Sequence, residues 1–172
     1  MVEAQFSAAN AYWAGDGVEK SEVNAVFWYK TAAAGGSRDA KYTLGVLYTQ
    51  GLGGTAEEIP DAAARAAMGF ELYCEAADLG ELRSKYNVGL EYLHGTGQVE
   101  QDLPRAAEFL TEAAEAGYVP AMVNLGKMFA TGLVGQLPGG VADVAKAREW
   151  FQKGADLGNE ESAEMLKAVP AV

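Results

Sequence analysis

Apolar residues recur four positions apart in pairs of stretches along this chain. One stretch has Ala40, Leu44 and Tyr48 at this spacing, and the stretch that follows it has Leu72 and Ala76. A spacing of four places side chains along one side of a helix. Each pair of stretches therefore predicts two helices joined by a loop, and the chain contains four such pairs.

The four pairs form a repeat, and each closes on a glycine. The first members of the pairs read "AQFSAANAYWAGDG" from Ala4, "AKYTLGVLYTQGLG" from Ala40, "SKYNVGLEYLHGTG" from Ser84 and "AMVNLGKMFATGLVG" from Ala121. We predict a single repeat domain over residues 1–172, with repeats at about 4–39, 40–83, 84–120 and 121–161. A half-repeat, "SAEML" from Ser162, predicts a cap over residues 162–172, which an open helical array needs to cover its last apolar face.

Glycine recurs inside the first helix of the repeat, at Gly45, Gly89 and Gly126. Glycine in a helix interior costs about 1 kcal/mol relative to alanine, so a packing gain must offset the loss. The second helix offers small residues opposite this position: Ala25, Gly69, Ala106 and Ala147. We therefore predict that the two backbones of each hairpin approach closely at the glycine.

The order Ala-x-Tyr-x-Leu-Gly-x-x-Tyr-x-x-Gly-x-Gly, followed by Ala-x-x-Trp-x-x-x-Ala-Ala-x-x-Gly, resembles the Sel-one-like repeat (SLR), a relative of the tetratricopeptide repeat. The segments "AKYTLGVLYTQGLG" and "AREWFQKGADLG" match it best, and the resemblance covers roughly residues 4–167. It implies an all-α fold, a right-handed α-solenoid whose first helices line a concave face. It also implies a scaffold or adaptor for protein–protein interaction, without a catalytic centre.

The acidic composition narrows the class of partner. Thirteen basic and 24 acidic residues give a net charge of −11 at pH 7, which repels phosphate backbones and anionic lipids. We therefore expect another protein or a peptide as the partner, and no nucleic acid. The N-terminal "MVEAQFSAAN" lacks the apolar core of a signal peptide, and no stretch is long enough to span a bilayer. These features predict a cytoplasmic chain without membrane insertion, although a removed leader stays open. We also expect a monomer.

The sequence predicts no catalytic residue, no cofactor and no metal site. His94 is the only histidine, and a general base would also need a nucleophile and an orienting partner. Cys74 is the only cysteine, and it is interpreted either as a partly exposed, oxidisable thiol or as a small packing residue. The resemblance adds an alternative, because cysteine-rich relatives bind or hydrolyse β-lactams. Those relatives carry paired cysteines, so we predict no enzyme. Self-association of the chain is a third possibility.

The two helices of the repeat differ on the faces turned away from the predicted core. The second helices carry acids at helical spacing, which predict a solvated outer face: Glu71, Glu75, Asp78, Glu108, Glu112 and Glu115. The first helices are mostly aromatic and aliphatic there. Part of this stripe must pack between neighbouring repeats, which would explain its tyrosines, and the rest is a place for a peptide or helix to dock. The candidate partner contacts are Asn10, Trp13, Tyr42, Val46, Thr49, Tyr86, Leu90, Leu93 and Lys127.

Overall fold

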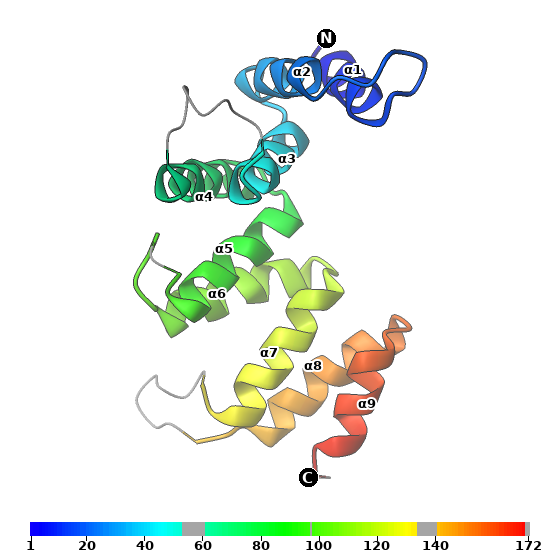
Figure 1. Cartoon of the computed structure of the whole chain (residues 1–172). Helices are drawn as coiled ribbons and strands as arrows, with labels where there is room; N and C mark the ends of the chain where they lie inside the picture. The colour runs from blue at the N-terminus through cyan, green and yellow to red at the C-terminus, as the bar shows by residue number, and fades with distance from the viewer. Residues whose placement is uncertain (53–60, 97, 134–140, 171–172) are drawn as a thin grey trace. The chain divides into compact units, whose positions relative to one another are not determined.

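The computed structural model describes residues 1–52, 61–96, 98–133 and 141–170, and these residues form helices and turns without a strand. The helices are α1 (Val2–Ala14), α2 (Glu22–Ala34), α3 (Arg38–Thr49), α4 (Ala62–Asp78), α5 (Leu82–His94), α6 (Leu103–Glu115), α7 (Val119–Thr131), α8 (Val144–Asp156) and α9 (Glu160–Ala168). Each predicted repeat contributes two of them, and the predicted cap contributes α9 (Figure 1). The prediction of an all-α repeat fold is confirmed.

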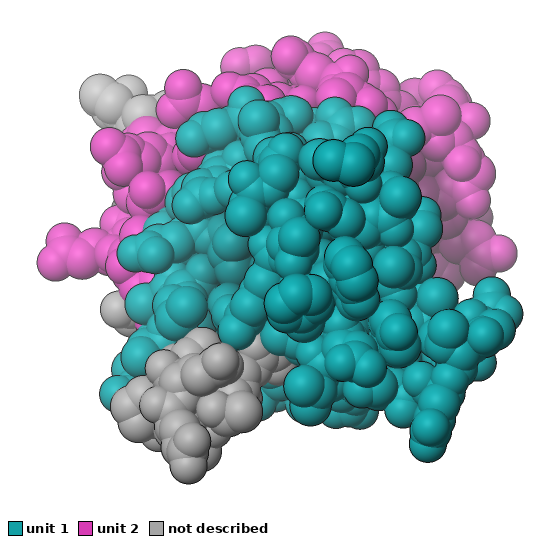
Figure 2. Space-filling model, turned by 90° about the horizontal axis from the view of Figure 1, so that it is seen from above, with its two compact units in different colours: residues 1–84 teal, residues 85–172 magenta. Residues whose placement is uncertain are grey.

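The helices are grouped in two compact units, Met1–Ser84 and Lys85–Val172, which are coloured separately in Figure 2. The core of the first unit is built around small and medium side chains such as Ala25, Ala32 and Leu44. The core of the second unit includes Leu110 and Leu125, which are fully buried. Each unit therefore has its own hydrophobic core. A single domain over residues 1–172 stays a prediction.

The two helices of the second repeat approach each other at the predicted glycine. A Cβ placed on Gly45 of α3 would lie 3.1 Å from the carbonyl oxygen of Gly69 in α4. It would also lie 2.6 Å from Cε1 of Tyr73, one turn further along α4. The absence of a side chain at Gly45 thus makes room for a backbone and for an aromatic ring. The sequence pattern predicted the first of these contacts but not the second.

The same arrangement recurs in the second unit. A Cβ on Gly89 of α5 would lie 2.9 Å from Cγ of Leu110, and one on Gly126 of α7 would lie 2.4 Å from Cε1 of Phe151. Leu110 and Phe151 also lie one turn after the small residue of the second helix, and both are buried. In each of these repeats, the recurring glycine therefore leaves space that one large side chain of the second helix fills.

A single residue at each junction ends one repeat and begins the next. Its backbone N–H donates to the carbonyl five residues earlier, at 2.9–3.1 Å, and the glycine before it has a positive φ of 81–93°. This geometry satisfies carbonyls that the end of the helix leaves without a partner. In three of the four junctions the same side chain also accepts a hydrogen bond from the first turn of the next helix. The junction residues are Ser37, Glu81, Tyr118 and Asn159.

The last helix, α9, packs against α8 and covers the end of the second unit. Arg148 of α8 binds its C-terminal end, since Nη1 donates to the carbonyls of Leu166, Val169 and Pro170 at 3.2, 2.8 and 3.3 Å. These carbonyls have no partner within the helix. The buried Ser162 lies against Gly154, where a Cβ would come within 2.2 Å of its Oγ. The contact between Gly154 of α8 and Ser162 of α9 thus resembles the contacts between small residues within the repeats before it.

Candidate functional site

The candidate residues of α1 are held by contacts with the second helix of their own repeat. The hydroxyl of Tyr29 in α2 donates to Oδ1 of Asn10 at 2.7 Å. Tyr29 is buried, whereas Asn10 remains exposed. Trp13 is half-buried and packs against the core of the first unit. This part of the stripe therefore has fixed side chains that solvent still reaches.

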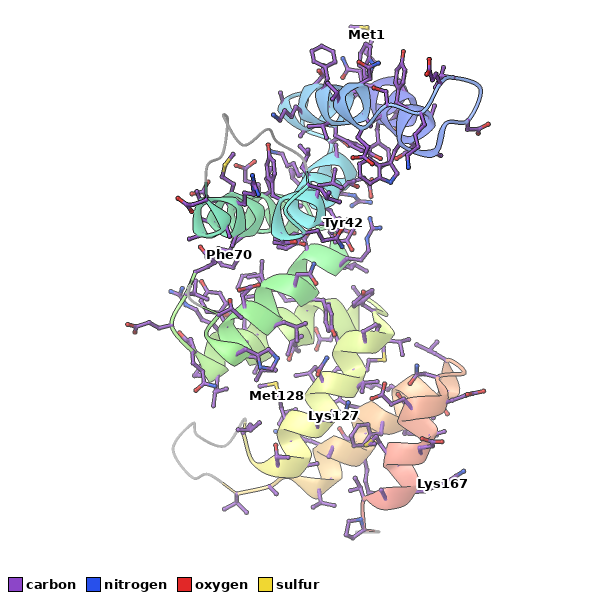
Figure 3. The ribbon with its side chains drawn as sticks, viewed as in Figure 1. Met1, Tyr42, Phe70, Lys127, Met128 and Lys167 are labelled. Carbon is purple, nitrogen blue, oxygen red and sulfur yellow. The ribbon has the colours of Figure 1, made fainter. Side chains whose placement is uncertain are left out.

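The candidate residue Tyr42 of α3 has contacts on two sides. Its ring lies 6.0 Å from the ring of Tyr73, and the guanidinium carbon of Arg83 lies 4.0 Å from its centroid. Arg83 is held in turn by Asp39 and Glu81, at 3.1 and 2.6 Å. Tyr42, which is labelled in Figure 3, is therefore mainly a packing residue between helices.

The end of α3 is more open. Val46 is half-buried and Thr49 is exposed. The hydroxyl of Thr49 donates to the carbonyl of Val46 at 2.9 Å and lies 3.4 Å from the hydroxyl of Tyr73. These two residues, together with Asn10 and Trp13 of α1, are the accessible part of the stripe in the first unit.

In the second unit, Tyr86 and Leu90 of α5 are half-buried and pack against the core. The hydroxyl of Tyr86 accepts a hydrogen bond from Nδ2 of Asn124 in α7 at 3.0 Å. Its ring meets the ring of Tyr118 edge to face, with centroids 5.2 Å apart. Tyr86 therefore links two successive repeats, as Tyr42 does in the first unit, and Leu90 has the less constrained side chain.

Leu93 does not belong to the accessible stripe, and its role as a partner contact stays a prediction. Its side chain is only 9% exposed and belongs to the core of the second unit, together with Leu103 and Leu110. The chain also returns to the end of α5, since Nε2 of Gln101 donates to the backbone carbonyl of Leu93 at 2.8 Å. Helical spacing places Leu93 on the face of the stripe, but it gives no information on contacts with the next helix.

Lys127 of α7, which is labelled in Figure 3, is exposed. Its ammonium forms an ion pair with Oε1 of Glu161 in α9 at 2.7 Å. Two other lysines of first helices pair with glutamates of second helices, Lys41 with Glu75 and Lys85 with Glu112. Helical spacing does not predict these pairs, because their members are 27 to 34 residues apart in the chain.

One position of the stripe is accessible in every repeat. It directly follows the glycine of the first helix, or Ala9 in the first repeat. The residue there is exposed in the first and fourth repeats and half-buried in the second and third. Its chemistry changes from an amide to a small aliphatic group, a larger aliphatic group and an ammonium group. The four residues are Asn10, Val46, Leu90 and Lys127.

The surroundings of His94 do not form a catalytic arrangement. His94 is exposed in the last turn of α5, and it makes no hydrogen bond to another described residue. Nearby, burial raises the pKa of Glu91, and the charge of His94 partly opposes this rise. Thr96 hydrogen-bonds to Glu91 and not to the imidazole. Among the described residues, no group of three His, Cys, Asp or Glu side chains could hold a metal ion.

Cys74 of α4 is half-buried among carboxylates. Burial, and then the charges of Asp78, Glu71 and Glu75, raise the pKa of the thiol to about 11. Both effects disfavour the thiolate, which is the nucleophilic form. The structure therefore favours the packing interpretation of Cys74 over the oxidisable one.

We expect Cys74 to react slowly with iodoacetamide in the folded protein at pH 8. A pKa raised from 9.0 to about 11 lowers the thiolate fraction about a hundredfold at this pH. Alkylation followed by mass spectrometry should show the rate rising with pH up to about 11, and the urea-unfolded chain should react at the rate of an ordinary thiol. Rapid labelling of the folded protein at pH 8 would contradict this prediction.

Comparison with known proteins identifies the same four repeats. The model of the Sel1 repeat matches residues 2–37, 38–81, 82–118 and 119–159, each boundary lying two residues before the predicted one. A Sel1 repeat protein from Oxalobacter formigenes is similar in structure, with a TM-score of 0.82 and 35% identity over 99% of this chain. The protective antigen c5321 of uropathogenic Escherichia coli, which displays an SLR fold, has a TM-score of 0.79 and 29% identity over 96% of this chain.

The chain spans less than half the length of these two structures, 46% and 32% respectively. No curated protein sequence matches it. Within the described residues, no helix combines the length and the apolar character needed to cross a membrane.

Proposed function

Because the chain belongs to the Sel1 repeat family, whose members commonly serve as protein-interaction scaffolds, we propose that it binds a peptide or helix of a partner protein on its first helices. The contacts proposed in the first unit are Asn10, Trp13, Val46 and Thr49, with Tyr42 at the edge. Those in the second unit are Leu90 and Lys127, with Tyr86 at the edge.

The observation that carries this proposal is the position that stays accessible in all four repeats. A position that served only the core would be buried and apolar in each copy. Here it changes from Asn10 to Val46, Leu90 and Lys127, whereas the glycine beside it is kept in three of the four repeats. A partner segment on either unit would therefore meet a different chemical group at each of the two repeats of that unit, which is a basis for specificity.

The proposed binding face is preorganised, which means that its side chains are ordered before a partner binds. Contacts between helices restrain several side chains of the face before a partner arrives, as in the Tyr29–Asn10 and Asn124–Tyr86 hydrogen bonds. Side chains that are already ordered lose less conformational entropy on binding. A concave face formed by the first helices, which the family resemblance implies, would add shape complementarity to this gain.

Selection of 12-residue peptides by phage display on the purified chain would test the proposal. We expect Val46→Glu or Leu90→Glu to weaken the selected peptides at least tenfold in fluorescence anisotropy, because each places a charge in an apolar contact. Ala145→Glu makes the same kind of change at an exposed position of α8 and should leave binding unchanged. Equal affinity for the wild-type chain and both stripe variants would place the binding surface elsewhere.

No observation favours the alternative of β-lactam chemistry, because the raised pKa keeps Cys74 protonated near neutral pH. A chromogenic β-lactam provides a direct check. Turnover by the purified chain that is lost in a Cys74→Ser variant would contradict a purely scaffolding role.

A further inference from the structure

The outer face of α2 is apolar where the other second helices are acidic. Phe27 lies two residues after Ala25, the small residue that packs in the hairpin. It is 60% exposed, and Val23, one turn before it, is 78% exposed. The residues that occupy the place of Phe27 in the other repeats are all exposed glutamates: Glu71, Glu108 and Glu149.

Local contacts orient Phe27. Its ring meets the ring of Trp28 edge to face, with centroids 5.4 Å apart and an interplanar angle of 78°. Trp28 is itself half-buried against the core of the first unit. Val23 and Phe27 are four residues apart, so they lie on one face of α2. Two large apolar side chains thus form an ordered, solvent-exposed pair on one face of a helix.

Acidic residues flank this pair. Glu19 and Glu22 are exposed before and at the start of α2, and neither forms an ion pair within the described part of the chain. Lys20 lies between them and Lys30 follows Phe27 by three residues, so the negative charge that favours a basic partner is that of the whole chain, −11, together with the exposed Glu19 and Glu22. An apolar pair beside unpaired carboxylates is complementary to a segment that has apolar residues on one side and basic residues next to them.

We propose that Val23 and Phe27 form a docking site for a basic amphipathic helix of another protein. A second copy of the chain fits this surface less well. Stable interfaces bury roughly 800 Å² on each partner, far more than two side chains offer. Two copies would also bring together chains that each carry a net charge of −11. The site lies on a second helix and does not depend on the function proposed for the first helices.

The probe for this proposal is a labelled 14-residue helical peptide of leucine and lysine, compared with a peptide in which glutamate replaces each lysine. We expect the basic peptide to bind the chain in fluorescence anisotropy, and Phe27→Glu or Val23→Glu to weaken binding at least tenfold. Phe27→Glu gives the first repeat the residue that the other three carry, so the fold should be retained, which circular dichroism and the melting temperature will verify. The variant also adds a negative charge, so weaker binding of a basic peptide must come from the lost apolar contact.

Leu157→Glu provides a matched control, since Leu157 is 59% exposed and lies outside α2. We expect its affinity to stay within twofold of that of the wild-type chain. Unchanged affinity of both α2 variants, or equal binding of the acidic peptide, would overturn the proposal. A dimer in light scattering that Phe27→Glu converts to a monomer would also overturn it, in favour of a second copy as the occupant.

Discussion

Gly126→Ala is expected to destabilise the protein by up to about 2 kcal/mol, because the usual cost of overpacking a core, about 1–3 kcal/mol, outweighs the helix-forming advantage of alanine. The added Cβ would lie 2.4 Å from Cε1 of Phe151 and 2.7 Å from Cδ1 and Cζ. Phe151 is 1% exposed, so its ring has no free space into which it could move. Alanine is the better helix former by about 1 kcal/mol, and the measured loss will be the difference between the two effects.

Urea unfolding of the wild-type chain and of three variants would measure this effect. Gly89→Ala should cost less, because its Cβ would lie 2.9 Å from Cγ of Leu110, a smaller overlap. Adding Phe151→Leu to Gly126→Ala should recover part of the loss, since the smaller side chain leaves room for the methyl group. If Gly126→Ala proved more stable than the wild type, the packing of Phe151 on α7 would be incorrect.

Leu110→Ala is expected to lower the free energy of unfolding by about 2–5 kcal/mol, the range for large-to-small changes in a core. Leu110 is fully buried in the core of the second unit, and its side chain also fills the space above Gly89. Removing it leaves a cavity beside two helices, and the glycine has no side chain with which to fill that cavity.

Chemical denaturation would measure this loss, with Glu108→Ala in the same helix as the control. Glu108 is exposed, so its replacement should change stability by no more than about 0.5 kcal/mol. A loss below about 1 kcal/mol for Leu110→Ala would indicate that the side chain is not part of a well-packed core.

The repeat and its hairpins could be predicted from the sequence because they rest on local periodicity. Residues four apart, such as Ala121 and Leu125, are buried as expected. Each matched repeat starts two residues before the recognisable alanine or serine, because that residue lies inside the helix and the helix begins two residues earlier, directly after its capping residue. Ser37, for example, precedes α3 and caps it through the N–H of Ala40 at 3.2 Å.

The accessible surface could be predicted only in part. Asn10, Val46 and Lys127 retain exposure because nothing in the described structure covers them fully. Leu93 is buried because it packs in the core with Leu103 and Leu110 of α6, and the pattern of one helix contains no information on such contacts with the next. The sequence shows that Phe27 stands where the other repeats have glutamates. Only the structure shows that its side chain is exposed to solvent, which makes it a candidate binding residue.

The residue shared by two helices at each junction has a consequence for how such a gene changes length. Ser37, Glu81 and Asn159 each end one repeat through a backbone N–H and cap the next helix through the side chain. Differences in repeat length fall between these points. Recombination between two junction codons would insert or delete one whole hairpin and leave every helix end with its hydrogen-bond partners. An array built in this way can lengthen or shorten by duplication without passing through an intermediate whose helices are broken.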